Sequence, residues 1–99
     1  GRGQALKSLA HLLSELQVRM QSVGLADAYH FEFPLIQLEI ADACGLTPVH
    51  VNRVMKRLRD DLLVTLHDGT LQIHDIDELR RACHFDANYL HLSAFDSRC

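Results

Sequence analysis

The chain has 99 residues, which is enough for one domain and too short for two. Apolar residues make up 47% of the chain and charged residues 23%, so the composition supports a hydrophobic core and is not typical of a disordered protein. The net charge of −3 argues against a uniformly basic surface, and no apolar run is long enough to span a membrane. We therefore expect residues 1–99 to fold as one domain.

The three cysteines, Cys44, Cys83 and Cys99, form an odd set without the C-x-x-C spacing of metal or redox sites. The first two fall on apolar helix faces, so we interpret them as reduced core residues, and the third as a free thiol. Together with the absence of a signal peptide, this pattern predicts a protein of the reducing cytoplasm.

An amphipathic first helix is predicted within residues 1–24. Its apolar residues recur at the three- and four-residue spacing of one helix face. They are Leu6, Leu9, Leu12, Leu13, Leu16 and Met20. The helix should run over about 4–22 and end near Gly24, because glycine favours the end of a helix.

A short strand should follow this helix. Tyr29, Phe31 and Phe33 alternate with polar residues, which predicts a strand with one buried aromatic face. Pro34 ends it, because proline lacks the N–H that a strand ladder needs.

A helix, a glycine turn and a second helix are predicted over residues 36–60. The first of these helices should span 36–44, with an inward-facing stripe of Leu38, Ala41 and Cys44. Gly45 supplies the left-handed residue that ends it. This arrangement has the spacing of a helix-turn-helix.

The second helix of this unit has a clear start signal. Leu46 should fill the corner between the two helices, Thr47 is a good N-cap, and Pro48 suits the first helical position because its missing N–H costs nothing there. The helix should continue to about Asp60.

A β-hairpin is predicted over residues 63–74. Asp68-Gly69 is typical of a two-residue type I′ turn, which needs positive φ at both central residues. A turn centred there pairs Leu66 with Leu71 and Val64 with Ile73 on one face. The other face then carries Thr65, His67, Thr70 and Gln72.

The last segment, residues 75–99, begins with a helix. Asp75 with Glu78 three residues later resembles a capping box. The inner stripe of this helix should be Ile76, Leu79, Ala82 and Cys83. The element order predicts an α/β, mainly α, fold: a winged helix-turn-helix with a small antiparallel β wing.

The helix that follows Thr47 separates into two faces when its residues are placed about 100° apart. The core face should contain Val51, Val54, Met55 and Leu58. The opposite face should contain Val49, His50, Arg53, Lys56 and Arg57, with Asn52 and Arg59 on one flank. Residues 47–59 carry a charge of +4 and the rest of the chain −7, so the positive charge is concentrated on this helix.

This distribution suits a recognition helix in the DNA major groove, whose N-terminal residues reach base edges. The candidate base-contacting residues are Val49, His50, Asn52 and Arg53. The candidate phosphate-contacting residues are Thr47, Lys56, Arg57 and Arg59 on the helix, and His67 and Thr70 on the wing. Solvated charges and an ordinary polar turn are the alternative interpretations of these residues.

The sequence leaves two alternatives to DNA binding. A winged helix that docks a protein partner on the same surface, or on its first helix, is the main alternative, because the remaining chain is acidic and Val49 is apolar. A small hydrolase or metal protein ranks far below, since the seven histidines are scattered and no H-E-x-x-H, paired-cysteine or glycine-rich phosphate motif is present. Cys83 and His84 are adjacent, so on a helix they diverge by about 100°. We therefore do not expect an enzyme or a metal site.

The segment FPLIQLEIADACGLTPVHVNRVMKRLRDDLLVTLHDGTLQIHD resembles the C-terminal DNA-binding domain of the Crp/Fnr transcription regulators. The resemblance rests on a set of core and turn positions together with the hydrophobic wing. These core and turn positions are Gln37, Ile40, Ala41, Gly45, Leu46, Thr47, Val51, Arg53 and Leu58. It extends upstream to VGLADAYHFEFPL and downstream to HFDANYLHL, so it covers nearly the whole chain.

The resemblance implies that Thr47 contacts a phosphate and that Arg53 reads a guanine. Pro48 and Val49 depart from the arginine or glutamate of many members, and Asn52 replaces a small residue, so the half-site of those members cannot be transferred. A sensor domain and a dimerisation helix are absent from these residues, and no cofactor is expected in them. The resemblance further implies double-stranded DNA as the partner and an intact homodimer on a palindromic site, and RNA polymerase is a candidate contact.

Overall fold

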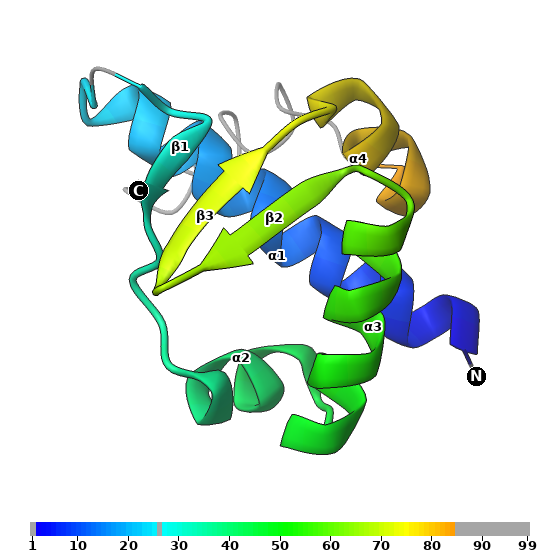
Figure 1. The fold of residues 1–99 in the computed structure, drawn as a ribbon. Helices are drawn as coiled ribbons and strands as arrows, with labels where there is room; N and C mark the ends of the chain where they lie inside the picture. The colour runs from blue at the N-terminus through cyan, green and yellow to red at the C-terminus, as the bar shows by residue number, and fades with distance from the viewer. Residues whose placement is uncertain (1, 26, 85–99) are drawn as a thin grey trace, which may run out of the picture.

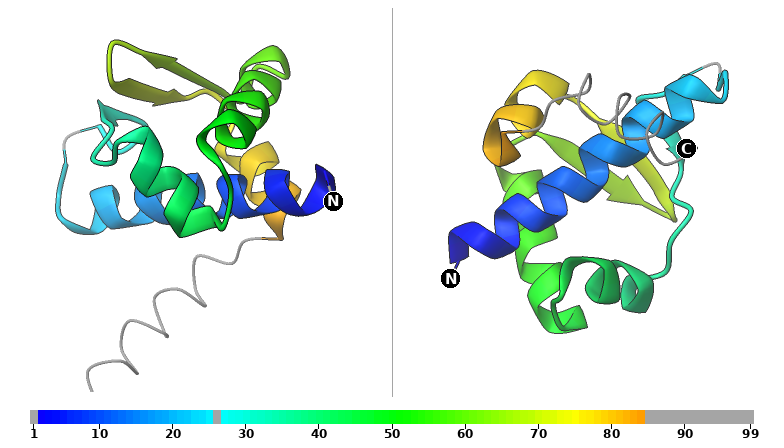
Figure 2. Two further views of the ribbon diagram at one scale, coloured as in Figure 1. Left: turned by 90° about the horizontal axis from the view of Figure 1, so that it is seen from below. Right: turned by 180° about the vertical axis from the view of Figure 1, so that it is seen from behind.

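The structure is a computed structural model that describes residues 2–25 and 27–84. Its elements are α1 (Arg2–Ser22), β1 (His30–Glu32), α2 (Gln37–Cys44), α3 (Pro48–Asp60), β2 (Val64–His67), β3 (Thr70–Ile73) and α4 (Ile76–Cys83) (Figure 1). The long helix α1 crosses one face of the sheet, while α2 and α3 lie beside one end of it (Figures 1 and 2). The predicted fold, a mainly helical winged helix-turn-helix with a small antiparallel sheet, is confirmed.

The first helix supplies much of the core. Leu9, Leu13 and Leu16 are buried, as their spacing predicts. Two polar residues of the same helix, Ser14 and Gln17, are also fully buried, because α4 packs against α1 there. The Arg80 guanidinium donates to the Gln17 Oε1 atom at 2.9 Å, so a polar contact lies within this helix pair.

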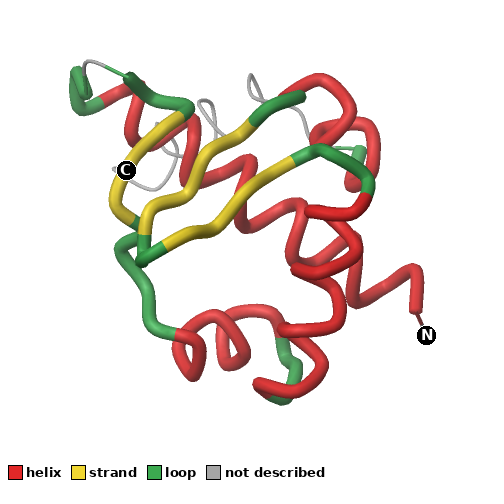
Figure 3. The backbone as a smooth tube through the Cα atoms, in the orientation of Figure 1, coloured by secondary structure: helices red, strands yellow, loops and turns green. Residues whose placement is uncertain are grey.

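The sheet has the strand order β1-β3-β2, and both pairs of neighbouring strands are antiparallel. The hairpin has the predicted register, with Leu66 opposite Leu71 and Val64 opposite Ile73. Its turn residues Asp68 and Gly69 have φ values of 51° and 78°, as a type I′ turn requires. The short strand predicted around Tyr29, Phe31 and Phe33 is present as β1, and its pairing with β3, which makes the sheet three-stranded (Figure 3), is a contact that local patterns did not indicate.

The inward stripe predicted for α2 is only partly correct. Ile40 and Ala41 are buried and Cys44 is half-buried, but Leu38 is 57% exposed. Leu38 lies about 110° around the helix from the middle of the Ile40–Ala41 face, as the spacing of about 100° per residue requires. An eight-residue helix therefore turns that side chain into solvent.

The aromatic face predicted around β1 is also only partly correct. Phe31 is buried and Phe33 is half-buried, whereas Tyr29 is 41% exposed. Tyr29 precedes the strand at the corner of the sheet, so its ring is only partly covered. Its carbonyl oxygen still accepts from the Ile73 N–H at 2.8 Å, which anchors the chain there.

The last helix begins as predicted, because the Asp75 carboxylate accepts from the Glu78 N–H at 3.0 Å. Leu79 is its fully buried residue. The expectations for residues 85–99, including the free thiol of Cys99, lie outside the described residues. Within the described ranges, no helix combines the length and hydropathy needed to cross a membrane.

Candidate nucleic-acid interface

The start of α3 is defined by three residues that lie close together in the chain. Gly45 has a left-handed φ of 67° and ends α2. The Thr47 hydroxyl then accepts from the His50 N–H at 3.2 Å, and Pro48 occupies the first helical position. Because the Thr47 oxygen serves as acceptor to the helix, its own O–H proton can be donated outward. The first turn of α3 thus presents a hydroxyl donor and the positive end of the helix dipole on the surface.

The rotation of α3 about its axis is fixed by four buried residues. They are Val51, Val54, Met55 and Leu58, each at most 7% exposed. This is the core face that the sequence predicts. The helix packs there against α1, α2 and β2, so its opposite side is directed away from the protein.

The opposite side of α3 carries the predicted site residues. Exposed residues on it are Val49, Asn52, Arg53, Lys56, Arg57 and Arg59, and His50 is half-buried. Val49 is 63% exposed near the start of the helix, where it forms an apolar spot. The predicted residues are therefore brought together on one accessible surface, and their individual contacts with DNA stay predictions.

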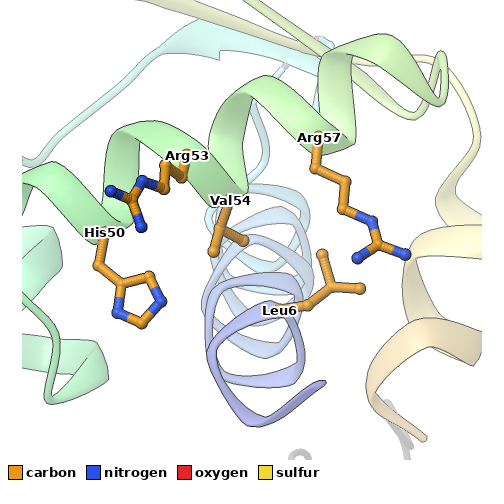
Figure 4. A pocket seen from close by; sticks show the side chains of 5 residues that line it. All are labelled: Leu6, His50, Arg53, Val54 and Arg57. Carbon is orange, nitrogen blue, oxygen red and sulfur yellow. The ribbon is translucent and has the colours of Figure 1, made fainter. Parts of the chain in front are cut away.

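One edge of this surface faces α1. His50, Arg53 and Arg57 line a pocket of about 190 Å³ whose floor is formed by Leu6 and Val54 (Figure 4). The Arg53 side chain extends toward His50, whereas Arg57 lies on the other side of Val54, near Leu6 (Figure 4). The sequence did not indicate that Leu6 would lie beside the recognition helix, because that contact joins two helices far apart in the chain.

The charges on α3 differ in how far they are neutralised. The Lys56 Nζ atom lies 3.3 Å from the Asp60 Oδ2 atom, and the Arg57 Nε atom lies 4.0 Å from the Asp61 Oδ2 atom. Among the described residues, no acidic group lies within 4 Å of the guanidinium groups of Arg53 and Arg59. Arg53 therefore offers an uncompensated charge and free N–H donors at the middle of the surface.

The opposite edge of the surface faces α2. There the Gln37 Nε2 atom donates to the Asn52 Oδ1 atom, and both side chains are exposed. Sequence analysis gave Gln37 no role in the site. The available signal was its position one turn before Ile40 and Ala41, which places it on the side of α2 that faces α3.

The wing is less favourable to an anion than α3. His67 is exposed and Thr70 is half-buried, but Asp68 lies between them at the turn. The His67 Nε2 atom is 3.2 Å from the Asp68 Oδ2 atom, and the Asp68 side chain is 89% exposed. An exposed carboxylate at the tip repels phosphates, so a phosphate contact by His67 or Thr70 would have to overcome it.

Within residues 2–25 and 27–84, no three His, Cys, Asp or Glu side chains lie close enough together to hold a metal ion. Cys44 and Cys83 have half-buried side chains, and burial raises the pKa of the Cys44 thiol. Burial therefore favours the neutral form of this thiol.

Comparisons with known proteins agree with this geometry. No curated protein matches the chain. The crystal structure of the Thermus thermophilus catabolite activator protein is similar in fold, with a TM-score of 0.64 and 22% sequence identity over 84% of this chain. The similar region makes up 35% of that protein, so the chain spans about a third of its length. A family model described as the Crp-like helix-turn-helix domain matches residues 7–82, and the chain therefore belongs to this family.

Proposed function

We propose that the chain binds double-stranded DNA sequence-specifically, as the DNA-binding domain of a Crp-like transcription regulator, with α3 in the major groove. The observation that carries the proposal is the position of Arg53. It lies at the middle of the exposed face of a helix whose other face is buried, and no described acidic group neutralises it. Family membership and the winged-helix fold support the same conclusion.

The geometry accounts for both kinds of contact. A major groove about 12 Å wide admits one α-helix. Arg53 can donate two hydrogen bonds to the O6 and N7 atoms of a guanine, and Val49 can contact a thymine methyl group. Thr47 and the N–H groups of the first turn are suited to a phosphate, which fixes the position of the helix on the duplex.

The intact regulator is proposed to bind as a homodimer. Two copies related by a two-fold axis would place their recognition helices about 34 Å apart, in successive major grooves of a palindromic site. The sensor domain and the dimerisation helix would belong to the part of the regulator that these residues do not include. Cytoplasmic location and a contact with RNA polymerase are parts of the same proposal.

The proposal can be tested with a random duplex pool and a matched pair of variants. Sequences bound by the chain are selected, and the affinity of the selected site is measured at two salt concentrations. Arg53→Ala should reduce discrimination at one base pair by about 1–3 kcal/mol, because it removes a bidentate base contact. Lys56→Ala should weaken all sequences alike and flatten the salt dependence. Unchanged affinity and site preference in Arg53→Ala would refute the assignment.

A protein-docking function is the second candidate. Three apolar residues near the starts of α2 and α3, Ile36, Leu38 and Val49, are 57–65% exposed. The same titration separates the two functions, because release of counterions from DNA gives a steep salt dependence that an apolar docking surface does not produce.

A further inference from the structure

We infer that Gln37 is a positioning residue for DNA reading, one that orients the side-chain amide of Asn52. In this arrangement the Asn52 Nδ2 group faces the major groove as a hydrogen-bond donor. The base that Asn52 reads should then present an acceptor, as guanine and thymine do. The inference rests on the proposed function and adds to it a residue from α2 and a direction of base preference.

The backbone explains why these two side chains meet. Gln37 is the first residue of α2, and it precedes Ile40 and Ala41 by one helical turn, so it shares their side of the helix. That side packs against α3, as the burial of both residues shows. Asn52 lies on the flank of α3 that faces α2, and its Oδ1 atom accepts from the Gln37 Nε2 atom.

The contact determines which end of the Asn52 amide remains available. An asparagine side chain ends in one carbonyl oxygen and one NH₂ group on opposite sides of Cγ. Because Gln37 engages the oxygen, the NH₂ group is the end of the amide that is left to bond a base. Asn52 therefore offers donors to the groove at the α2 edge of the surface, whereas Arg53 extends toward the α1 edge.

A donor selects among the base edges in the major groove. Guanine presents the O6 and N7 acceptors and thymine the O4 acceptor, whereas the cytosine edge presents an N4 donor. Adenine presents the N7 acceptor beside an N6 donor, and the Asn52 oxygen, which already accepts from Gln37, is less available to pair with that donor. We therefore expect guanine or thymine ahead of adenine, and cytosine last, on the strand that Asn52 faces.

Fixing the amide in advance also reduces the entropy lost on binding. Both side chains are exposed, so without the contact each would sample several rotamers and would have to be ordered by the DNA. The hydrogen bond from Gln37 removes part of this cost before DNA arrives.

The test compares selected sites for the 99-residue chain and four variants. Asn52→Ala identifies the base pair that Asn52 reads, because the base preference at that position of the selected site should be lost in this variant. Gln37→Ala should lower the guanine-or-thymine preference at that position by about 3- to 10-fold, the range that one ordinary hydrogen bond gives. Gln4→Ala, which removes an exposed glutamine of α1, is the matched control and should leave the preference unchanged.

Gln37→Glu gives the sharpest result. A carboxylate cannot donate to the Asn52 oxygen but can accept from its NH₂ group, so the amide should turn over and present its oxygen to the groove. The preference at that one position should then shift toward adenine or cytosine. A purely structural role, or a phosphate contact by Gln37 itself, would weaken all sequences alike without this reversal.

The outcomes separate the inference from the proposed function. If the unaltered chain selects no sequence, the proposed function fails and the inference fails with it. If the chain selects a site, but Gln37→Ala and Gln37→Glu keep the preference of the unaltered chain at the Asn52 position, only the inference is overturned. A site in which Asn52→Ala flattens no position would overturn it as well.

Discussion

Two aspartates at the end of the recognition helix should limit its affinity for DNA. Asp60 is the last residue of α3 and Asp61 follows as its C-cap, and their carboxylates pair with Lys56 and Arg57. The double substitution Asp60→Asn with Asp61→Asn removes both negative charges and releases both cations. We expect it to raise DNA affinity, because the released cations can then contact phosphates without losing a partner.

The size of the effect follows from the charges. A carboxylate about 7 Å from a phosphate repels it by roughly 0.6 kcal/mol at the dielectric constant of water. Two such carboxylates give about 1.2 kcal/mol, which is between about five- and tenfold in affinity at 25 °C. The fold should be little affected, since exposed ion pairs contribute about 0.2–1 kcal/mol and negative charges at a helix C-terminus are unfavourable by a similar amount.

The assay is a binding titration with the selected duplex over a series of salt concentrations. The gain in affinity should be largest at low salt and should shrink as salt screens the phosphates. The slope of log affinity against log salt concentration should become steeper by up to about 2. Asp27→Asn is the matched control. It removes one such charge just before β1, at the sheet edge opposite to β2, the strand that α3 contacts, and it keeps an acceptor for the Tyr29 N–H.

Two results would refute this reasoning. One is an affinity at low salt that does not rise in the double variant. The other is an equal rise in Asp27→Asn, which would show that only the total charge of the chain matters.

Three further predictions concern stability and the thiols. Leu62 is 76% exposed and has a left-handed φ of 62°. The free energy of unfolding, measured in urea, should therefore be about 1 kcal/mol higher for Leu62→Gly than for Leu62→Ala, which is the reverse of the order of Gly and Ala inside a helix. Leu58→Ala should destabilise the domain by about 2–5 kcal/mol in the same assay, because it leaves a cavity where a side chain only 1% exposed was packed. Val49→Ala is the control: Val49 is 63% exposed, so the free energy of unfolding should change by less than about 0.5 kcal/mol. Because burial raises the pKa of the Cys44 thiol, its thiolate should form at higher pH in the folded chain than in urea. Alkylation followed by peptide mass spectrometry should show this shift, and equal pH profiles would contradict it.

The features predicted correctly from sequence depend on a few neighbouring residues. The Thr47-Pro48 start of α3, the left-handed Gly45 and the Asp68-Gly69 turn each follow from the backbone preferences of those residues. The two faces of α3 follow from helical periodicity alone. In each case the required conformation is local, so the signal is complete within a short segment.

The features that sequence did not reveal depend on contacts between distant segments. The pairing of β1 with β3 joins residues about 40 positions apart, and the burial of Ser14 and Gln17 depends on where α4 packs. The contact of Gln37 with Asn52 likewise needs the crossing of α2 and α3. None of these can be derived from the periodicity of a single helix or strand.

The direction of the Arg53 side chain depends both on the sequence of α3 and on long-range packing. Turning α3 by one residue step, about 100°, would move its buried apolar side chains toward solvent and its polar flank toward the core. Each of those four side chains contributes about 1.5–3 kcal/mol when buried, so losing half of the total would cost about 3–6 kcal/mol. A loss of that size is comparable with the whole stability of a small domain, about 5–15 kcal/mol. The core therefore determines where Arg53 points, and a chain with a net charge of −3 can still present an uncompensated arginine where a DNA groove would receive it.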